Sequence, residues 1–290
     1  MEFSSVQQLQ ELAEQEHITI GQLSLREQAK QMECSEDEVY RQMEQMLDVM
    51  QESIKGGNIP GRRSVSGITG GDGILMNRYA KTNGIMGYLF NHAIANAISV
   101  AEYNAMMGKI VASPTAGSCG ILPGTVIAVM EEKGLPKKDA VMALFTAGAI
   151  GMVVAKNASI AGAEGGCQAE CGSAAAMAAA ALVEMSGGTP EMAANACAIA
   201  IKNQLGLVCD PVAGLVEVPC IKRNAGGVGV AFVAAEMALA GIKSVIPVDE
   251  VIESMRLIGD AMPCSLKETG IGGLAGTPTG VRIKKEVYGE

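Results

Sequence analysis

The N-terminal part of the chain carries the clearest hydrophobic periodicity. After Ser35, apolar side chains recur at the spacing of one face of an α-helix. These apolar positions are Val39, Met43, Met46, Leu47, Met50 and Ile54. Residues 56–61, which contain three glycines and one proline, then predict the end of this helix.

Two Ser-x-x-Glu sequences in the same region have the spacing of capping boxes, in which serine and glutamate side chains satisfy free backbone N–H groups. One joins Ser24 to Glu27, and the other joins Ser35 to Glu38. Apolar residues before Ser35 predict a shorter helical hairpin, and they are Leu9, Leu12, Ile18, Ile20, Leu23 and Leu25. We interpret residues 1–55 as a helical cap, with a partner-docking arm as the alternative.

Residues 56–290 continue the helical pattern and lack the alternation of apolar and polar residues that is typical of β-strands. Three segments rich in alanine and methionine predict helices over residues 174–185, 192–204 and 228–240. Thr189 followed by Pro190 has the pattern of a helix start. Runs of Val, Ile and Thr long enough for a central sheet are missing. The sequence therefore predicts an all-α protein, a compact bundle of small-residue-rich helices with glycine-rich loops converging on one site.

Composition and charge divide the chain into two parts. Of all residues, 49% are hydrophobic but only 3% are aromatic, and 36 are glycine. Residues 1–55 hold 12 acidic and 4 basic side chains, a net charge of −8, whereas residues 56–290 hold 19 acidic and 18 basic side chains. The neutral body argues against a nucleic-acid-binding protein, which needs a basic face, and the apolar content excludes a disordered chain.

The N-terminal residues do not show a basic segment followed by an apolar run, so we expect no secretory signal peptide. The longest window without charged residues covers the 21 residues 110–130. Prolines and glycines interrupt this window, and a broken backbone exposed to lipid would leave polar groups unsatisfied. We therefore expect buried protein interior rather than a membrane span, and a cytoplasmic setting.

The chain has eight cysteines, at positions 34, 119, 167, 171, 197, 209, 220 and 264. A disulfide framework is not expected in a cytoplasmic chain. Cys167, Cys209 and Cys220 are separated by 41 and then 10 residues, in segments bounded by glycine or proline. Three thiolates around a four-iron cluster would leave one iron open, and an open iron can act as a Lewis acid. Structural zinc and inert buried thiols stay as alternatives, because the spacing is not that of common ferredoxins.

Five glycine-rich loops carry polar side chains that helix packing does not require, and they cover residues 62–73, 113–124, 162–173, 209–224 and 263–273. Loop 113–124 leads into a predicted helix, whose N-terminal N–H groups would suit a carboxylate. None of the loops has the ending of a phosphate-binding loop or a dinucleotide fingerprint. Taken one at a time, the loops also fit ordinary connections between helices.

Four motifs that overlap these loops, SPTAGSCGILPG, GAEGGCQAECGSA, GLVCDPVAGLVEVPCIKRN and SLKETGIGGLAGTPTG, closely resemble those of the iron–sulfur-dependent L-serine dehydratases, also called L-serine ammonia-lyases. The resemblance covers residues 60–280 and is to the alpha chain of the two-subunit type. It implies that residues 56–290 form an all-helical catalytic domain holding a [4Fe–4S] cluster on Cys167, Cys209 and Cys220. It also implies a heterodimer with a beta chain of ACT-type regulatory fold, no pyridoxal phosphate, and a role in serine degradation and gluconeogenesis.

The resemblance further implies a reaction and its residues. The open iron would bind the carboxylate and β-hydroxyl of L-serine, and a base would remove the Cα proton, giving pyruvate and ammonia through aminoacrylate. The expected substrate-binding residues are Ser113, Thr115, Ser118, Arg223 and Asn224. Lys267 and Ser66 are the expected candidates for the base, with Glu164 or a beta-chain histidine as alternatives. His92 lies in an apolar run and is expected to be a buried core histidine. The competing interpretation is an iron–sulfur redox or sensing protein without lyase activity.

Overall fold

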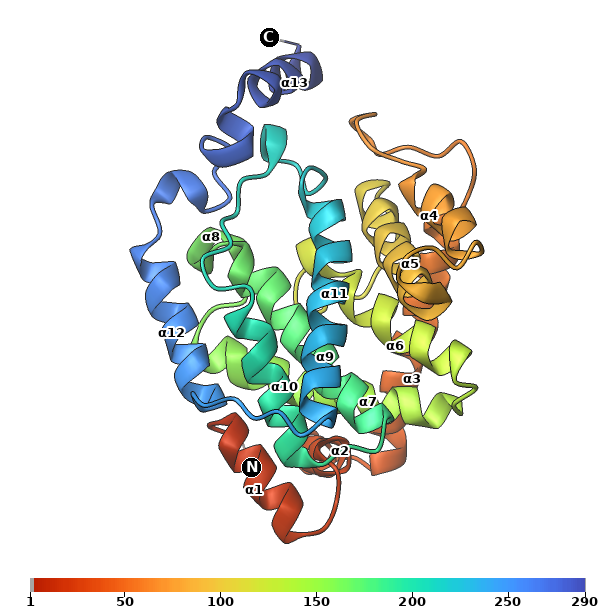
Figure 1. The fold of residues 1–290 in the computed structure, drawn as a ribbon, viewed down its shortest axis with the longest axis vertical. Helices are drawn as coiled ribbons and strands as arrows, with labels where there is room; N and C mark the ends of the chain where they lie inside the picture. The colour runs from red at the N-terminus through yellow and green to blue at the C-terminus, as the bar shows by residue number, and fades with distance from the viewer. Residues whose placement is uncertain (1–2, 290) are drawn as a thin grey trace.

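A computed structural model describes residues 3–289, and these residues form helices and loops without any β-strand (Figure 1). The predicted all-α fold is confirmed. In chain order the α-helices are α1 (Val6–Gln15), α2 (Ile20–Gln31), α3 (Glu36–Gly57), α4 (Asp72–Ala80), α5 (Gly87–Ala105), α6 (Ile121–Glu132), α7 (Lys137–Asn157), α8 (Gly162–Gly165), α9 (Ser173–Met185), α10 (Pro190–Lys202), α11 (Cys220–Leu239), α12 (Val248–Ala261) and α13 (Pro278–Tyr288). Short helical turns between them are η1 (Ala116–Ser118), η2 (Gln168–Gly172), η3 (Val212–Gly214), η4 (Cys264–Leu266) and η5 (Gly273–Gly276).

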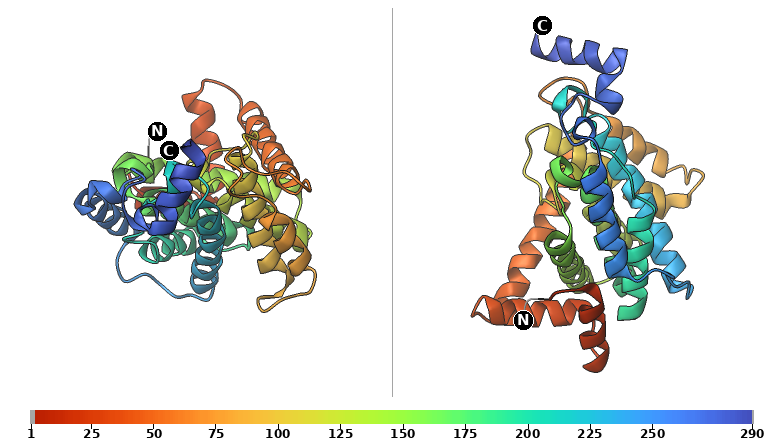
Figure 2. Two further views of the ribbon diagram at one scale, coloured as in Figure 1. Left: turned by 90° about the horizontal axis from the view of Figure 1, so that it is seen from above. Right: turned by 90° about the vertical axis from the view of Figure 1, so that its left-hand side faces the viewer.

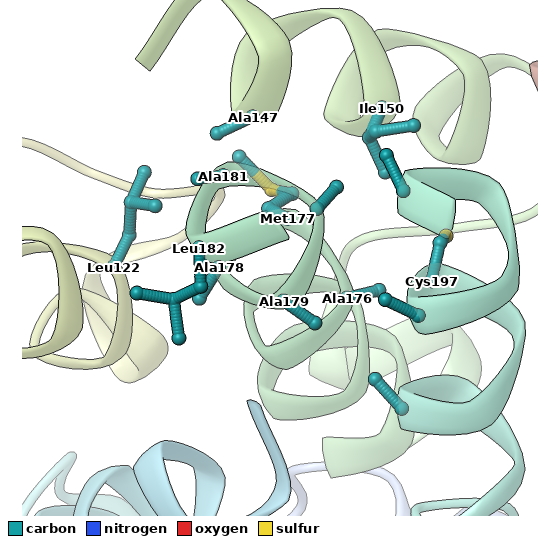
Figure 3. Packing of buried hydrophobic residues seen from close by; sticks show 14 of the residues in the cluster. Leu122, Ala147, Ile150, Ala176, Met177, Ala178, Ala179, Ala181, Leu182 and Cys197 are labelled. Carbon is teal, nitrogen blue, oxygen red and sulfur yellow. The ribbon is translucent and has the colours of Figure 1, made fainter. Parts of the chain in front are cut away.

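Helix α9 lies at the centre of the bundle, where every residue from Ser173 to Val183 is buried. Figure 3 shows its small side chains packed among residues of the surrounding helices, including Leu122 of α6, Ile150 of α7 and Cys197 of α10. Because alanine has a short side chain, neighbouring helices can approach α9 closely and still fill the space between them. The predicted helices over residues 174–185 and 192–204 are confirmed as α9 and α10. The third begins earlier than expected, at Cys220.

One of the two predicted capping boxes is wrong. Helix α2 begins at Ile20, and its cap is Thr19, whose hydroxyl accepts from the backbone N–H of Gln22 while the Gln22 side chain accepts from Thr19 N–H. Ser24 is a buried residue in the interior of α2. The earlier start places Ile20 and Leu23 in the core, and that burial decides between two possible caps. The capping box at Ser35 and the helix start at Thr189 are both confirmed.

The three N-terminal helices pack onto the body of the bundle (Figure 2). Leu9, Leu23 and Leu47 are buried in the same hydrophobic cluster as the alanines of α9. The end of α3 lies directly against α5, since a Cβ added at Gly57 would meet the carbonyl oxygen of Ser99 at 1.9 Å. The domain boundary expected at residue 55 falls close to the end of α3 and stays a prediction.

Two apolar segments bear on the question of a membrane. Within residues 3–289, α7 is the helix that is long and apolar enough to span a membrane, and 67% of its most apolar window is buried inside the protein. Such a helix is also typical of a protein core, and α7 packs against α9 and α2. In the uncharged window 110–130, residues 117–130 are all buried, as expected for protein interior.

Candidate functional site

The structure brings the three predicted cysteine ligands together from three separate segments. Cys167 immediately precedes the π-helical turn η2, Cys209 lies between α10 and η3, and Cys220 is the first residue of α11. All three are at most 9% exposed. Burial, together with the neighbouring Cys167 and Glu170, raises the pKa of the Cys220 thiol to about 12. Burial also raises the pKa of the Cys209 thiol, and the neighbouring Glu170 and Cys167 add to this effect.

A fourth cysteine lies beside this group. The sulfurs of Cys167 and Cys171 are 3.4 Å apart, because the π-helical turn places both on one side of the chain. The hydrogen bond between the two thiols and the nearby positive charge of Arg223 lower the pKa of the Cys167 thiol, against the effect of burial. The thiolate is the form that binds metals. Cys167 is therefore the cysteine of the three whose surroundings favour the ligand form.

The buried carboxyl of Glu170 is a member of the site that the sequence analysis missed. It accepts a hydrogen bond from the Thr115 hydroxyl at 2.8 Å and lies 3.8 Å from the sulfur of Cys209. Burial raises its pKa. A Cβ added at Gly162 would meet the Glu170 carboxylate at 2.7 Å and Cys209 Sγ at 2.9 Å, so glycine is required there. The available signal was a single acidic residue between two cysteines, in the segment GCQAEC.

Loop 113–124 supplies the hydroxyls that the resemblance assigns to substrate binding. The hydroxyl oxygens of Thr115 and Ser118 are 3.2 Å apart. The Ser113 hydroxyl is buried and has no hydrogen-bond partner within residues 3–289. A buried hydroxyl without a partner costs free energy, so such a group in a folded protein points to a ligand or an ordered water. Among the three predicted hydroxyls, that of Ser113 is thus the one left for a substrate.

Asn224 anchors this loop to α11. Its amide oxygen accepts from the N–H of Gly120 at 2.8 Å, and its amide nitrogen donates to the carbonyls of Gly117 and Cys220 at 2.8 and 2.9 Å. The residue is completely buried. These contacts fix loop 113–124 relative to Cys220. Direct contact between Asn224 and a substrate stays a prediction.

Arg223 carries the positive charge nearest to the cysteines. Its guanidinium lies 2.8 Å from the buried carboxylate of Asp210 and donates to the carbonyl of Val208 at 2.8 Å. The other oxygen of Asp210 accepts from the N–H of Leu274 at 2.7 Å. The sequence analysis did not single out Asp210, which holds Arg223 in place and also binds the C-terminal loop.

The backbone around Lys267 pairs with the backbone of Cys209 in the manner of two parallel β-strands. Cys209 N–H donates to the carbonyl of Leu266, and Glu268 N–H donates to the carbonyl of Cys209, each at 2.8 Å. Lys267 also lines a cleft of about 410 Å³, together with Glu164. Two of the predicted candidates for the base therefore share one cleft. Cys264, at the start of the same loop, is exposed to solvent.

Ser66 belongs to a different part of the site. Its hydroxyl donates to the buried carboxylate of Glu217 at 2.8 Å, and the hydroxyl of Thr69 donates to the other oxygen at 2.5 Å. Loop 62–73 is thereby tied to loop 209–224, which contains two of the cysteines. The hydrogen bonds of the described residues connect Ser66 to this anchor and not to a cysteine.

Replacing Glu217 by alanine should release loop 62–73, because two hydroxyls lose a charged acceptor. Each hydrogen bond to a charged group contributes about 1.5–3 kcal/mol, so local opening should become about tenfold more frequent or greater. Trypsin cleavage after Arg62 or Arg63 measures this opening. The matched control is Glu236→Ala, which removes an exposed carboxylate on α11. Equal cleavage rates in both variants would contradict the anchoring role.

The positions of the cysteine side chains bear on which kind of metal group the site could hold. In the part of the chain that the structure describes, no three His, Cys, Asp or Glu side chains converge closely enough for a single metal ion. The thiolate ligands of a four-iron cluster stand farther apart than those of one ion, because the cluster lies between them. Three buried thiols contributed by three separate segments fit such a cluster in their donor chemistry and in their burial.

Comparison with known proteins connects this geometry to a family. The family model described as "Serine dehydratase alpha chain" matches residues 15–275. The chain is 50% identical over 288 residues to a protein of Bacillus subtilis named probable L-serine dehydratase, alpha chain, covering 99% of this chain and 96% of that one. It is 46% identical over 276 residues to the L-serine dehydratase alpha chain of Peptoniphilus asaccharolyticus, covering 94% of each. It is 35% identical over 282 residues to the L-serine dehydratase of Helicobacter pylori, covering 95% of this chain and 62% of that protein. This chain belongs to the serine dehydratase alpha-chain family.

Proposed function

We propose that this chain is the catalytic alpha chain of an L-serine dehydratase, a lyase that converts L-serine to pyruvate and ammonia. Family membership and the names of the similar proteins support this activity. The observation that carries the proposal is a group of three buried cysteines with a fixed arginine, to which Glu170 and Asn224 tie loop 113–124. Within the described residues this loop holds a buried serine hydroxyl, that of Ser113, without a hydrogen-bond partner. A small zwitterionic substrate needs such a polar site with little apolar surface.

The proposed cofactor is a [4Fe–4S] cluster held by Cys167, Cys209 and Cys220, which takes the place of pyridoxal phosphate. When bound, its open iron would supply a Lewis acid that helps the β-hydroxyl leave as hydroxide. The support is the donor chemistry, since three thiols from separate segments lie buried beside one another. Glu170, next to Cys209, keeps the surrounding loops in register by accepting from Thr115.

The chain's own side chains would bind and orient the substrate. The Ser113 hydroxyl would donate to the substrate carboxylate, while Thr115, which donates to Glu170, and Ser118 beside it would hold loop 113–124 in position. Arg223 would add a positive charge that Asp210 holds in position. Loss of the Cα proton and of hydroxide gives aminoacrylate, which tautomerises to an imine and is hydrolysed by water. Lys267 is the proposed acceptor of the Cα proton, because its backbone pairs with that of Cys209. It lines a cleft together with Glu164, the alternative acceptor in this chain.

We also propose that the chain works with a second, beta chain of ACT-type regulatory fold. Two of the most similar proteins are named alpha chains, which indicates a partner for each. The Helicobacter pylori protein is longer than this chain, which spans 62% of it. A histidine of the beta chain is the alternative proton acceptor. The cytoplasmic location and the role in serine degradation and gluconeogenesis stay predictions.

The activity is tested by purifying the chain without oxygen, together with the beta chain, and measuring iron, sulfide and pyruvate formed from L-serine. We expect an iron–sulfur cluster, pyruvate production, and a change in the cluster's Mössbauer spectrum when serine is added. An intact cluster without pyruvate from any β-hydroxy amino acid would contradict the proposal. Reversible one-electron cycling with no response to serine would instead support the redox or sensing alternative.

A further inference from the structure

A second polar pocket lies apart from the cysteine site, between α3, α4, α5 and α6. Its volume is about 280 Å³. None of its lining residues belongs to the five glycine-rich loops, so neither the proposed reaction nor the cluster uses it. Asn96 and Ile127 lie deepest in the protein, while Lys55 and Glu131 are exposed to solvent.

The floor of this pocket has buried polar atoms without partners. Asn96 is 2% exposed, and its amide nitrogen has no hydrogen-bond partner within residues 3–289. Nδ1 of His92, one helical turn earlier on α5, is also buried and makes no hydrogen bond, and it lies 3.9 Å from Oε1 of Glu132. Neighbouring amides differ, because Asn77 donates to Asn58, and Asn58 donates to Ser99 Oγ. A buried amide left unsatisfied costs about 1–3 kcal/mol, which points to a molecule that binds there.

The rim of the pocket carries one charge of each sign. The ammonium of Lys55, in the last turn of α3, makes no ion pair or hydrogen bond in the described part of the chain. Glu131, near the end of α6, lies 3.8 Å from Nε2 of His92. The two charges line the same pocket without forming an ion pair with each other. A ligand that carries both a negative and a positive group would complement this arrangement.

We propose that this pocket binds a small free α-amino acid. Its carboxylate would accept from the Lys55 ammonium and the Asn96 amide, and its ammonium would donate to the Glu131 carboxylate. The volume of about 280 Å³ and the few apolar lining residues favour glycine, alanine or a similarly small side chain. The proposal does not rest on the lyase reaction, because none of its residues is part of the cysteine site.

The two histidines of the chain provide a direct readout. His17 and His92 are the only histidines, so their imidazole signals can be assigned in the full chain by NMR with a His17→Gln variant. Glycine and L-alanine are suitable probes, because they lack a β-hydroxyl and cannot be dehydrated. We expect a saturable shift of the His92 signal and no shift of the His17 signal. Acetate and methylammonium, which carry one charge each, should bind at least about tenfold more weakly.

Charge-neutral variants identify the pocket. Lys55→Gln and Glu131→Gln should each raise the dissociation constant about tenfold or more, since each removes a charged hydrogen bond. Glu52→Gln on α3 and Lys133→Gln after α6 are matched exposed controls and should leave it unchanged. The proposal is overturned if no amino acid shifts His92, as for a pocket that holds only water. It is equally overturned if acetate alone has the full effect, or if the controls and the pocket variants behave alike.

Discussion

Cys209→Ala should abolish retention of the iron–sulfur cluster and lower pyruvate formation from L-serine by about 100-fold or more. The Cys209 sulfur is buried beside Glu170, and no thiol–thiol contact is found for it among the described residues. Cys167 is a less decisive target, because Cys171 lies 3.4 Å from it and offers a substitute thiol. The measurements are iron and sulfide per chain after anaerobic purification, followed by the pyruvate assay.

Cys34→Ala is the control for this experiment. Cys34 lies between α2 and α3, and the same loss of a thiol there should leave both the iron content and the activity unchanged. Cys220→Ala should behave like Cys209→Ala. Full cluster occupancy in Cys209→Ala would show that the assignment of the ligands is wrong, even if the chain is still an active lyase.

Gly120→Ala should lower the free energy of unfolding by about 3 kcal/mol and remove most activity. A Cβ at this position would meet the backbone carbonyl of Ala97 at 2.2 Å, and this oxygen belongs to α5 and cannot move on its own. Relief of the clash would push loop 113–124 away from α5. The same shift would break the hydrogen bond from Gly120 N–H to Asn224, which holds the loop beside Cys220.

Urea denaturation of the full chain measures the stability change, with Gly226→Ala as the matched control. Gly226 lies within α11, and nothing lies within 4 Å of a Cβ added there. Since alanine favours a helix over glycine, this variant should be stabilised by roughly 0.5–1 kcal/mol. If both variants unfold at the same urea concentration, close packing at Gly120 does not limit stability.

The helices could be predicted from the sequence because their signals are local. Apolar spacing predicted α3, and alanine-rich composition predicted α9 and α10. The start of α2 was placed wrongly, because Thr19 and Ser24 both have capping sequences and only the packing of Ile20 and Leu23 distinguishes them. A choice made by burial in the assembled core cannot be read from the local pattern.

The sequence predicted members of the candidate site only where the residue type has few chemical roles in proteins. The three cysteines stood out because thiols in glycine- and proline-bounded segments have few common uses. Glu170 and Asp210 did not stand out, since an acidic residue in a sequence is usually exposed to solvent. Their roles depend on contacts with Thr115 and Arg223, which lie far away along the chain.

The exposed position of Cys264 makes the native chain open to chemical labelling. Six of the eight thiols are buried and Cys34 is intermediate, so a thiol-reactive dye should attach first at Cys264. That dye would lie in the same loop as Lys267, which lines the cleft of about 410 Å³. Fluorescence from a single unengineered position could then follow, in real time, the arrival of a substrate or of a partner chain at this end of the molecule.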